Sequence, residues 1–322
     1  MINRRTIMFA ALSMAACFPA RGEKKGAVTL WGPPAAPSII LVNAIHNGLL
    51  NKIIPDVSFR AWKTPDEMRA GIASGQMEAV ILPSYVAANF YNKKLDIRLV
   101  NILTGGLMYI VTREGYIRNI EDLAGKKIAV NFKNDMPDFI FRRVLQQNSM
   151  KPSDVDIIYT TTSQESAQML VSGRVEATLM GEPGATAIIT MAKKKGVILE
   201  RAIDIQSLWA ASEKNRVIPQ AGLAVTGPFL KRIGMAGLET MQNAFSETVN
   251  RVITENTVAA QIAAPLLDLP ADIIARSIGF SNLVSVRASQ ARPDLESLFS
   301  ILAEDDPRII GGQMPDDRFY AI

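Results

Sequence analysis

The sequence is poor in the residues that build metal centres and disulfides. Its 322 residues include one cysteine, Cys17, and one histidine, His46. A disulfide needs two cysteines, and a structural zinc site takes about four ligands, most of them Cys or His. These counts exclude a disulfide within the chain and a metal centre of the His/Cys type, and we expect no cofactor.

Motifs of catalysis and of nucleic-acid binding are also missing. A Ser-His-Asp triad would have to use His46, which falls inside a predicted helix, and no serine lies in a nucleophile-elbow pattern. The sequence contains no glycine-rich phosphate loop. Lysine and arginine total 35 against 31 aspartate and glutamate, and no basic stripe is interleaved with aromatic residues. We therefore expect neither an enzyme nor a nucleic-acid-binding protein.

The N-terminus has the pattern of a signal peptide. Arg4 and Arg5 precede an apolar segment, 6–16, which is too short to span a bilayer as a helix. We expect residues 1–17 to direct export, so that the mature protein lies in the periplasm or at the cell surface. The two arginines also resemble part of a twin-arginine signal, and the export route stays open.

The single cysteine has two interpretations. Cys17 follows Met14-Ala15-Ala16, which resembles the bacterial lipobox, although Met14 stands where that pattern prefers leucine. A lipid on Cys17 would tether the mature chain to a membrane by acyl chains. In the other interpretation the signal is simply cleaved and Cys17 is incidental. We expect no contact with the membrane beyond such an anchor.

One stretch occurs twice at a constant offset. Residues 64–84 read TPDEMRAGIASGQMEAVILPS, and residues 162–182, which begin 98 positions later, read TSQESAQMLVSGRVEATLMGE. Each copy predicts a helix that begins with a capping box, ends at a glycine and leads into a short buried strand. The capping pairs and glycines are Thr64 with Glu67 and Gly75, and Thr162 with Glu165 and Gly173. Two such units in one chain predict two lobes built on similar plans.

The alternation of strands and helices continues on both sides of each copy. It predicts an α/β protein with two lobes, each a mainly parallel sheet flanked by helices. A hydrophobic content of 48% with 20% charged residues is typical of a globular protein. The extended apolar runs 107–112 and 222–226 are the predicted crossings between the lobes and form the hinge. Lobe one then comprises 27–106 plus 227–322, and lobe two comprises 107–226.

Three segments together resemble a known family. They are IEDLAGKKIAV at 120–130, SGRVEATLMGEP at 172–183 and the tail MPDDRFY at 314–320. With the export signal, they are similar to the substrate-binding components of bacterial ABC importers, in the branch that holds nitrate, taurine, alkanesulfonate and thiamine-precursor binding proteins. The resemblance implies the type II periplasmic-binding-protein fold. It also implies a monomer that captures a small molecule between its lobes and delivers it to ABC permease and ATPase subunits.

Candidate ligand contacts lie where predicted strands end, because ligands of open α/β sheets bind outside the carboxyl ends of the strands. Hydroxyls, amides and a carboxylate there can hydrogen-bond a ligand, aromatic rings can stack on it, and a proline-rich loop lets the backbone approach it. The candidates are Pro34, Ala36, Ser38, Trp62, Ser84 and Tyr85 on lobe one, and Asn131, Asn134 and Glu182 on lobe two. Each has a structural alternative: the serines as helix caps, the aromatics as core, and Glu182 as the partner of a cation or of a helix N-terminus.

Ligand charge and biological role stay open. Helix N-termini at Ser38 and Ser84 suit an anion, whereas Glu182, Asp135 and Asp138 suit a cation or a neutral donor. Two alternatives to transport remain: an enzyme on the same fold, of the menaquinone-pathway or thiamine-pyrimidine-synthesis type, and a binding protein that feeds a sensor. The export signal disfavours the enzyme, because those relatives act in the cytoplasm.

Overall fold

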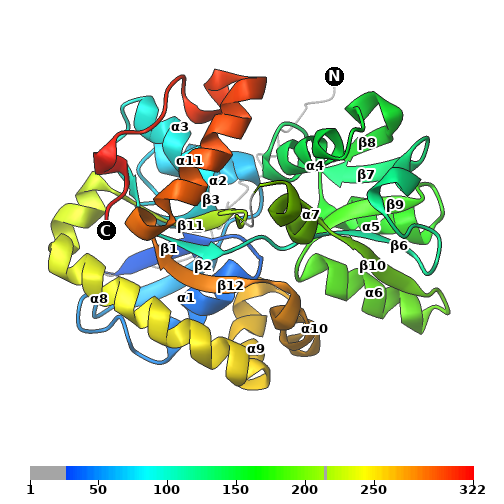
Figure 1. Cartoon of the computed structure of the whole chain (residues 1–322). Helices are drawn as coiled ribbons and strands as arrows, with labels where there is room; N and C mark the ends of the chain where they lie inside the picture. Colours follow the sequence, from blue (N-terminus) through cyan, green and yellow to red (C-terminus); the bar gives the residue numbers. More distant parts are fainter. Residues whose placement is uncertain (1–26, 214–215) are drawn as a thin grey trace, which may run out of the picture.

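The structure, a computed structural model that describes residues 27–213 and 216–322, has two lobes, each built on its own β-sheet (Figure 1). The sheet of lobe one has the strand order β12-β5-β11-β3-β1-β2, and β4 also pairs with β11. Its strands are β1 (Val28–Gly32), β2 (Val57–Ala61), β3 (Ala79–Pro83), β4 (Ile97–Leu99), β5 (Asn101–Thr104), β11 (Ala221–Thr226) and β12 (Leu283–Arg287).

The sheet of lobe two has the order β10-β6-β9-β7-β8. Its strands are β6 (Met108–Arg113), β7 (Lys127–Asn131), β8 (Asp156–Thr160), β9 (Ala177–Gly181) and β10 (Leu199–Asp204). Residues 1–17, including Cys17, lie outside the described residues, so the expectations about export and lipidation have no structural counterpart here. None of the helices in the described ranges has the length and apolarity that a membrane crossing requires.

Helices cover both faces of each sheet, as expected for an α/β protein. In lobe one, α1 (Pro37–His46), α8 (Gly227–Thr254), α9 (Asn256–Leu267) and α10 (Ala271–Ser277) pack on one face, and α2 (Pro65–Ala73), α3 (Ser84–Asn92) and α11 (Ala288–Asp305) pack on the other. In lobe two, α4 (Met136–Gln147) and α7 (Ile205–Ser212) lie opposite α5 (Ser163–Val171) and α6 (Gly184–Lys194). The remaining short 3₁₀ turns are η1 (Ile120–Leu123), η2 (Pro152–Asp154), η3 (Ile278–Phe280), η4 (Pro307–Ile310) and η5 (Asp317–Phe319).

The central strand β3 shows why both faces are covered. Val80 and Leu82 point into one apolar cluster, and Ala79 and Ile81 point into the other. All four are fully buried, because successive side chains of a strand alternate between the two faces of its sheet. A strand that is apolar on both sides must lie between two layers of helices.

The two repeated stretches fold into equivalent helix–glycine–strand units, as predicted. The capping boxes are incomplete, because Glu67 and Glu165 accept from the N–H groups of Lys63 and Thr161, one residue before each capping threonine. The hydroxyl oxygens of Thr64 and Thr162 each accept a hydrogen bond from the backbone N–H three residues on, and both are 3.1 Å long. Gly75 and Gly173 end the two helices in the left-handed region, with φ of 77° and 75°. Strands β3 and β9 then begin at equivalent positions, Ala79 and Ala177.

The predicted crossings and the predicted sheets both differ from the structure. Residues 108–113 form β6, wholly inside the sheet of lobe two, and residues 221–226 form β11, wholly inside the sheet of lobe one. The chain therefore crosses at residues 105–107 and again between α7 and β11, so lobe two ends before residue 221. Extended apolar runs readily become strands of a sheet, because their backbone N–H and C=O groups need hydrogen-bond partners once they are buried.

Each sheet is mixed, and the expectation of mainly parallel sheets holds for three adjacent strands at one end of each, β3-β1-β2 and β9-β7-β8. β1 runs parallel to β2 and β3, and β7 runs parallel to β8 and β9. β6 and β11 run antiparallel to β9 and β3, respectively. Both strands enter their sheet from a crossing, next to the carboxyl ends of the parallel strands, and so they must run in the opposite direction.

Candidate functional site

The carboxyl ends of β3 and β9 meet the two crossings at equivalent positions of the repeat. The N–H of Ser84 donates to the Gln220 carbonyl, 3.1 Å away, in the second crossing. The N–H of Glu182 donates to the Leu107 carbonyl, 3.0 Å away, in the first crossing. The strand ends predicted to carry the ligand contacts therefore lie at the junction of the lobes.

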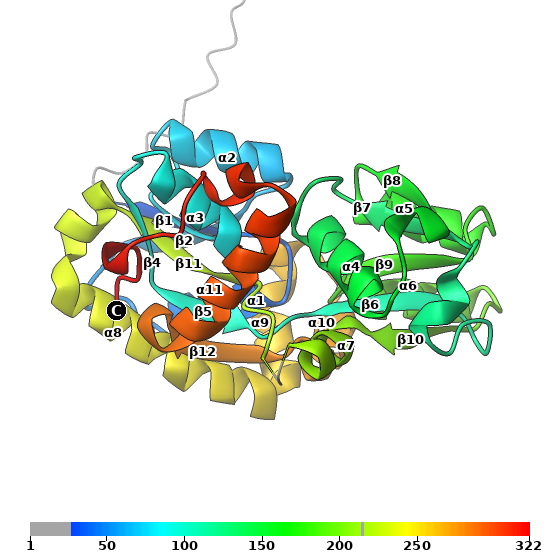
Figure 2. The same cartoon turned by 45° about the horizontal axis from the view of Figure 1, so that its top comes forward.

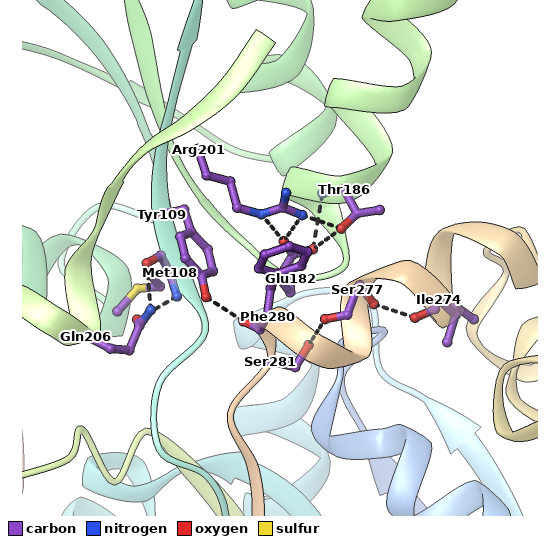
Figure 3. Close-up of polar contacts among 10 residues, drawn as sticks. All are labelled: Met108, Tyr109, Glu182, Thr186, Arg201, Gln206, Ile274, Ser277, Phe280 and Ser281. Carbon is purple, nitrogen blue, oxygen red and sulfur yellow. Dashed lines mark hydrogen bonds and ion pairs between the residues drawn. The ribbon is translucent and has the colours of Figure 1, made fainter. Parts of the chain in front are cut away.

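Glu182 forms the interactions of its structural alternative. Its side chain is buried, one oxygen accepts from Arg201 Nε at 2.7 Å, and the other accepts from the N–H and hydroxyl of Thr186 at 3.1 and 2.8 Å (Figure 3). Thr186 lies in the first turn of α6, where a carboxylate is favoured. Burial raises the pKa of Glu182, and the Arg201 charge opposes that rise. A direct contact of Glu182 with a ligand stays a prediction.

Both candidate serines donate their hydroxyl within the fold. Ser38 donates to the Pro33 carbonyl at 2.6 Å, and Ser84 donates to the Pro219 carbonyl at 2.7 Å. Both side chains are fully buried. A methyl group on Gly32 would lie 2.4 Å from Ser38 Oγ, so the chain needs glycine there. The hydroxyls thus hold the β1–α1 loop and the second crossing in place.

The other candidates are divided between the protein interior and the junction. Pro34 is exposed, Ala36 is buried, and α1 begins at Pro37 without a side-chain cap. Trp62 is buried, and its Nε1 donates to the Ile81 carbonyl at 3.0 Å. Asn131 donates to Ser163 Oγ at 3.2 Å, within lobe two. Asn134 has a left-handed backbone (φ 59°), and its N–H donates to the Asp138 carboxylate at 2.8 Å.

Tyr85 takes part in a polar contact between the lobes. Its hydroxyl donates to one oxygen of Asp135 at 2.7 Å, and Arg69 Nη2 donates to the other at 2.8 Å. Arg69 also donates to the Tyr85 hydroxyl at 3.0 Å. Arg69 and Tyr85 belong to α2 and α3 of lobe one, whereas Asp135 is the N-cap of α4 in lobe two. We call these three residues the Asp135 clasp.

The clasp is largely shielded from water, so its charges interact strongly. Asp135 and Tyr85 are buried, and the Tyr85 ring meets Phe139 of lobe two edge-on, with centroids 5.7 Å apart. Burial, followed by the neighbouring Asp135 carboxylate, raises the pKa of Tyr85 well above its ordinary value. Tyr85 is therefore a neutral hydroxyl donor at any physiological pH.

A cavity of about 880 Å³ lies next to the clasp and is lined by both lobes. This volume lies within the range of about 300–1,000 Å³ that is usual for small-molecule sites. Lobe one contributes Arg69, Ala70, Ala73, Tyr85, Val86, Asn89, Phe90, Lys93, Asp305, Asp306, Arg308 and Ile309, and lobe two contributes Asn134, Phe139 and Arg142. The lining combines aromatic walls with charges of both signs, which suits a polar organic molecule.

The C-terminal segment forms one wall of this cavity and is held by two asparagines of α3. Asn89 donates to the carbonyls of Arg308 and Ile309 at 2.8 and 3.0 Å, and Asn92 donates to the Ile310 carbonyl at 2.6 Å. Gly311 follows in the left-handed region, where a methyl group would lie 2.7 Å from Asn92 Cβ. The wall therefore depends on a tight turn that a larger residue would disturb.

Arg142 is the one cavity residue with a buried polar atom that has no hydrogen-bond partner in the described part of the chain. Its Nε lies 3.3 Å from the Asp138 carboxylate without the geometry of a hydrogen bond. The guanidinium lies over the Phe139 ring, 5.5 Å from its centroid. Asp138 itself accepts from the Tyr159 hydroxyl at 2.9 Å. Arg142 Nε is thus enclosed by protein beside Asp138, and the guanidinium places a positive charge at the cavity wall.

The sequence pointed to part of this region and missed the rest. Tyr85 and Asn134 do line the cavity, and Asp135 lies beside it. Arg69, Phe139 and Arg142 were not candidates, because they sit inside helices instead of at strand ends. The capped helices 65–73 and 136–147 follow such ends, and their first two turns were the available signal.

Among residues 27–213 and 216–322, no group of three or more His, Cys, Asp and Glu side chains is placed to hold a metal ion. The single histidine, His46, is the last residue of α1 and is exposed. The sequence predicted His46 inside a helix, whereas the helix ends at this residue.

Comparisons with known proteins agree with this architecture. The family model described as "NMT1/THI5 like" matches residues 91–205, which include all five strands of lobe two. No curated protein matches the chain by sequence.

Solved structures match over nearly the whole chain. An ABC transporter protein from Parabacteroides distasonis has a TM-score of 0.74 and 20% identity, and the match covers 92% of this chain and 99% of that one. The periplasmic aliphatic sulphonate binding protein SsuA from Escherichia coli has a TM-score of 0.68 and 19% identity, covering 91% and 98%. The periplasmic nitrate-binding protein NrtA from Synechocystis PCC 6803 has a TM-score of 0.64 and 16% identity, covering 88% and 84%. The chain therefore has the type II periplasmic-binding-protein fold, as the resemblance implied.

Proposed function

We propose that this chain is the extracytoplasmic solute-binding component of an ABC importer. In this role it captures a small molecule between its lobes and delivers it to a membrane permease that works with ATPase subunits. The observation that carries the proposal is the cavity lined by α2, α3 and η4 of lobe one together with α4 of lobe two. The fold shared with SsuA and NrtA, which are described as binding proteins, supports it.

Capture and release follow from the way the site is divided. A ligand that touches Tyr85 on lobe one and Phe139 or Arg142 on lobe two makes its full set of contacts while the lobes are together. Such a ligand shifts the population toward the closed arrangement, in proportion to its difference in affinity for the two arrangements. A permease that recognises the closed arrangement would then receive loaded protein in preference to empty protein.

Arg142 and the aromatic walls have separate roles in this proposal. The Arg142 guanidinium supplies a positive charge at the cavity wall, next to the Asp138 carboxylate. Tyr85, Phe90 and Phe139 supply apolar surface that removes the ligand from water. The clasp already uses both oxygens of Asp135, so this carboxylate is not free to bind a ligand cation.

A thermal-shift screen with taurine, a short alkanesulfonate, nitrate, a pyrimidine and a small amine tests the proposal. A probe that binds the folded chain raises the melting temperature in proportion to the logarithm of its concentration. For that probe we expect Phe139→Ala to weaken binding at least tenfold and Arg142→Gln to weaken it severalfold. Tyr116→Ala, which removes a half-exposed aromatic that does not line the cavity, is the matched control.

Two results would contradict the proposed site. Binding that is unchanged in both cavity variants would place the ligand elsewhere. Identical small-angle scattering profiles with and without a saturating probe would show that capture does not close the lobes.

We also propose that Cys17 carries the lipid that tethers the exported chain. The Cys17→Ser variant should then move from the membrane fraction to the soluble extracytoplasmic fraction. An unchanged distribution between the fractions would favour the interpretation in which Cys17 is incidental.

A further inference from the structure

A short segment of lobe one binds directly to the first crossing. The carbonyls of Ser281 and Asn282 accept hydrogen bonds from Thr104 Oγ1 at 2.8 Å and from the Gly105 N–H at 2.9 Å. The Asn282 side chain donates back to the Gly106 carbonyl, also at 2.9 Å. These contacts fasten the residues just before β12 to the place where the chain passes between the lobes.

The residue before them, Phe280, reaches into lobe two. Its carbonyl accepts from the Tyr109 hydroxyl at 2.8 Å, and its ring lies under the Arg201 guanidinium, with Cζ 3.8 Å from the ring centroid (Figure 3). The Tyr109 ring stands perpendicular to it, 6.2 Å away. Glu182 holds Arg201 in this position from the other side. We call Phe280, Tyr109 and Arg201 the Phe280 joint.

The turn that presents Phe280 is rigidly supported from its own lobe. The buried Ser277 and Ser281 hydroxyls donate to the carbonyls of Ile274 and Ser277 at 2.8 and 2.7 Å. Asn282 adopts a left-handed backbone (φ 42°), which asparagine tolerates better than most residues. The turn therefore places the ring and the carbonyl of Phe280 together against lobe two.

The two contacts between the lobes lie at different distances from the crossings. Tyr109 is on β6, the strand that continues the first crossing, and Arg201 is on its neighbour β10. Asp135 follows β7, two strands away from β6 in the order β6-β9-β7, which is about 10 Å at the usual strand spacing. In Figure 1, α4 lies above and α10 lies below the segments that connect the lobes, and in the turned view of Figure 2 α10 overlaps these segments in projection.

We propose that the Phe280 joint is the pivot about which the lobes turn, a contact that persists while the Asp135 clasp opens and closes. In a rotation, displacement grows with distance from the axis, and hinge axes pass through the segments that connect the moving bodies. The joint lies beside such a segment and the clasp does not. The proposal goes beyond the proposed function, because it concerns the lobes alone and holds whether or not a ligand is found.

Distances between paired spin labels test this without a ligand. The Cys17→Ser background has no other cysteine, so two new cysteines label cleanly. One pair, Arg276→Cys with Lys193→Cys, joins exposed positions of α10 and α6 across the joint, and a second pair, Gln76→Cys with Gln146→Cys, joins exposed positions across the clasp. Arg69→Ala with Tyr85→Phe then removes the clasp from lobe one while leaving lobe two unchanged.

We expect removal of the clasp to lengthen and broaden the Gln76–Gln146 distance distribution and to leave the Arg276–Lys193 distribution unchanged. Phe280→Ala should broaden the Arg276–Lys193 distribution. Tyr116→Ala should not, although Tyr116 is also half-exposed and lies under a cation, Lys126, at 4.9 Å inside lobe two.

Three results would overturn the proposal. The first is an Arg276–Lys193 distance that lengthens as much as the Gln76–Gln146 distance once the clasp is removed. The second is an Arg276–Lys193 distribution that Phe280→Ala does not change. The third is a set of distances that stays fixed in every variant, because the lobes would then not turn about the joint.

Discussion

Ser84 and Glu182 occupy the same position in the two repeats, but their side chains form different interactions. Both donate a backbone N–H to a crossing, at 3.1 and 3.0 Å. The Ser84 hydroxyl makes a second bond to the second crossing, at Pro219, whereas the Glu182 carboxylate turns back into its own lobe toward Arg201 and Thr186. The backbone geometry of the two copies is shared, and the side chains differ in which body they stabilise.

This difference shows that the two repeats share their backbone hydrogen bonds and differ in their side-chain interactions. A hydrogen bond from a strand end to a crossing is needed in both lobes, because it fixes each sheet to the hinge. An ion pair is needed in lobe two, where the edge strand β10 has to be held beside the Phe280 joint. Four predictions probe the comparison, and they follow in order of expected effect.

Glu182→Ala should have the largest effect on stability. It leaves the partly buried Arg201 without its carboxylate, and breaking a buried ion pair from one side costs about 3–5 kcal/mol. We expect the free energy of unfolding in urea to fall by about this amount. The double variant Glu182→Met with Arg201→Met should recover much of the loss, because no charge is then stranded. A loss for the single variant below about 1 kcal/mol would show that the pair is effectively a surface pair.

Ser84→Ala should cost less, about 1–2 kcal/mol, because it removes one neutral hydrogen bond and leaves the buried Pro219 carbonyl with fewer partners. Ser84→Thr, which keeps the hydroxyl, is the conservative control. If Ser84→Ala lowered the free energy of unfolding in urea as much as Glu182→Ala does, the proposed difference between the two positions would be wrong.

Thr64→Ala and Thr162→Ala should each cost about 1 kcal/mol, the usual value of a lost helix N-cap. The informative quantity is their difference, which should be within a few tenths of a kcal/mol because the two caps have the same length and exposure. Serine at either position should restore the stability. A clear inequality would mean that the repeats are equivalent in shape and not in energy.

The smallest effect is a pH dependence at Glu182. Its pKa is raised in the folded chain above the ordinary value of 4.5, so the folded state binds this proton more tightly than the unfolded state does. The unfolding free energy of the wild type, relative to Glu182→Gln, should therefore rise as the pH falls toward 4.5 and decline as the pH rises through the folded pKa. Parallel pH profiles of the two proteins would show that the carboxyl titrates normally.

Local chemistry accounts for what could be predicted of the fold. Some sequence signals determine the local conformation by themselves, and the structure reproduces them. They are the capping threonines, the glycines at 75 and 173 and the short apolar strands. The crossings were misplaced because an extended apolar run looks the same in a sheet and between sheets. Its hydrogen-bond partner decides between the two, and for β11 that partner is β3, about 140 residues earlier in the chain.

The location of the site was predicted, but most of the residues that line it were not. Strand ends do meet at the junction, yet the hydroxyls of Ser38 and Ser84 are used by nearby carbonyls. Arg69 forms its clasp with Asp135, 66 residues away on the other lobe. A lone arginine on a helix gives no sign of such a partner, because the contact exists after two separately folded bodies have met.

The wall formed by residues 308–311 gives the cavity a part that belongs to neither βαβ repeat. It is bound through main-chain carbonyls to Asn89 and Asn92. Gly311 is required by the turn and Ile310 is buried, whereas the exposed Arg308 side chain can vary without loss of attachment. Substitution of Arg308 can then change the chemistry of the cavity wall while the hinge and both sheets stay untouched. Protein engineers can therefore vary the cavity at this position without rebuilding the fold.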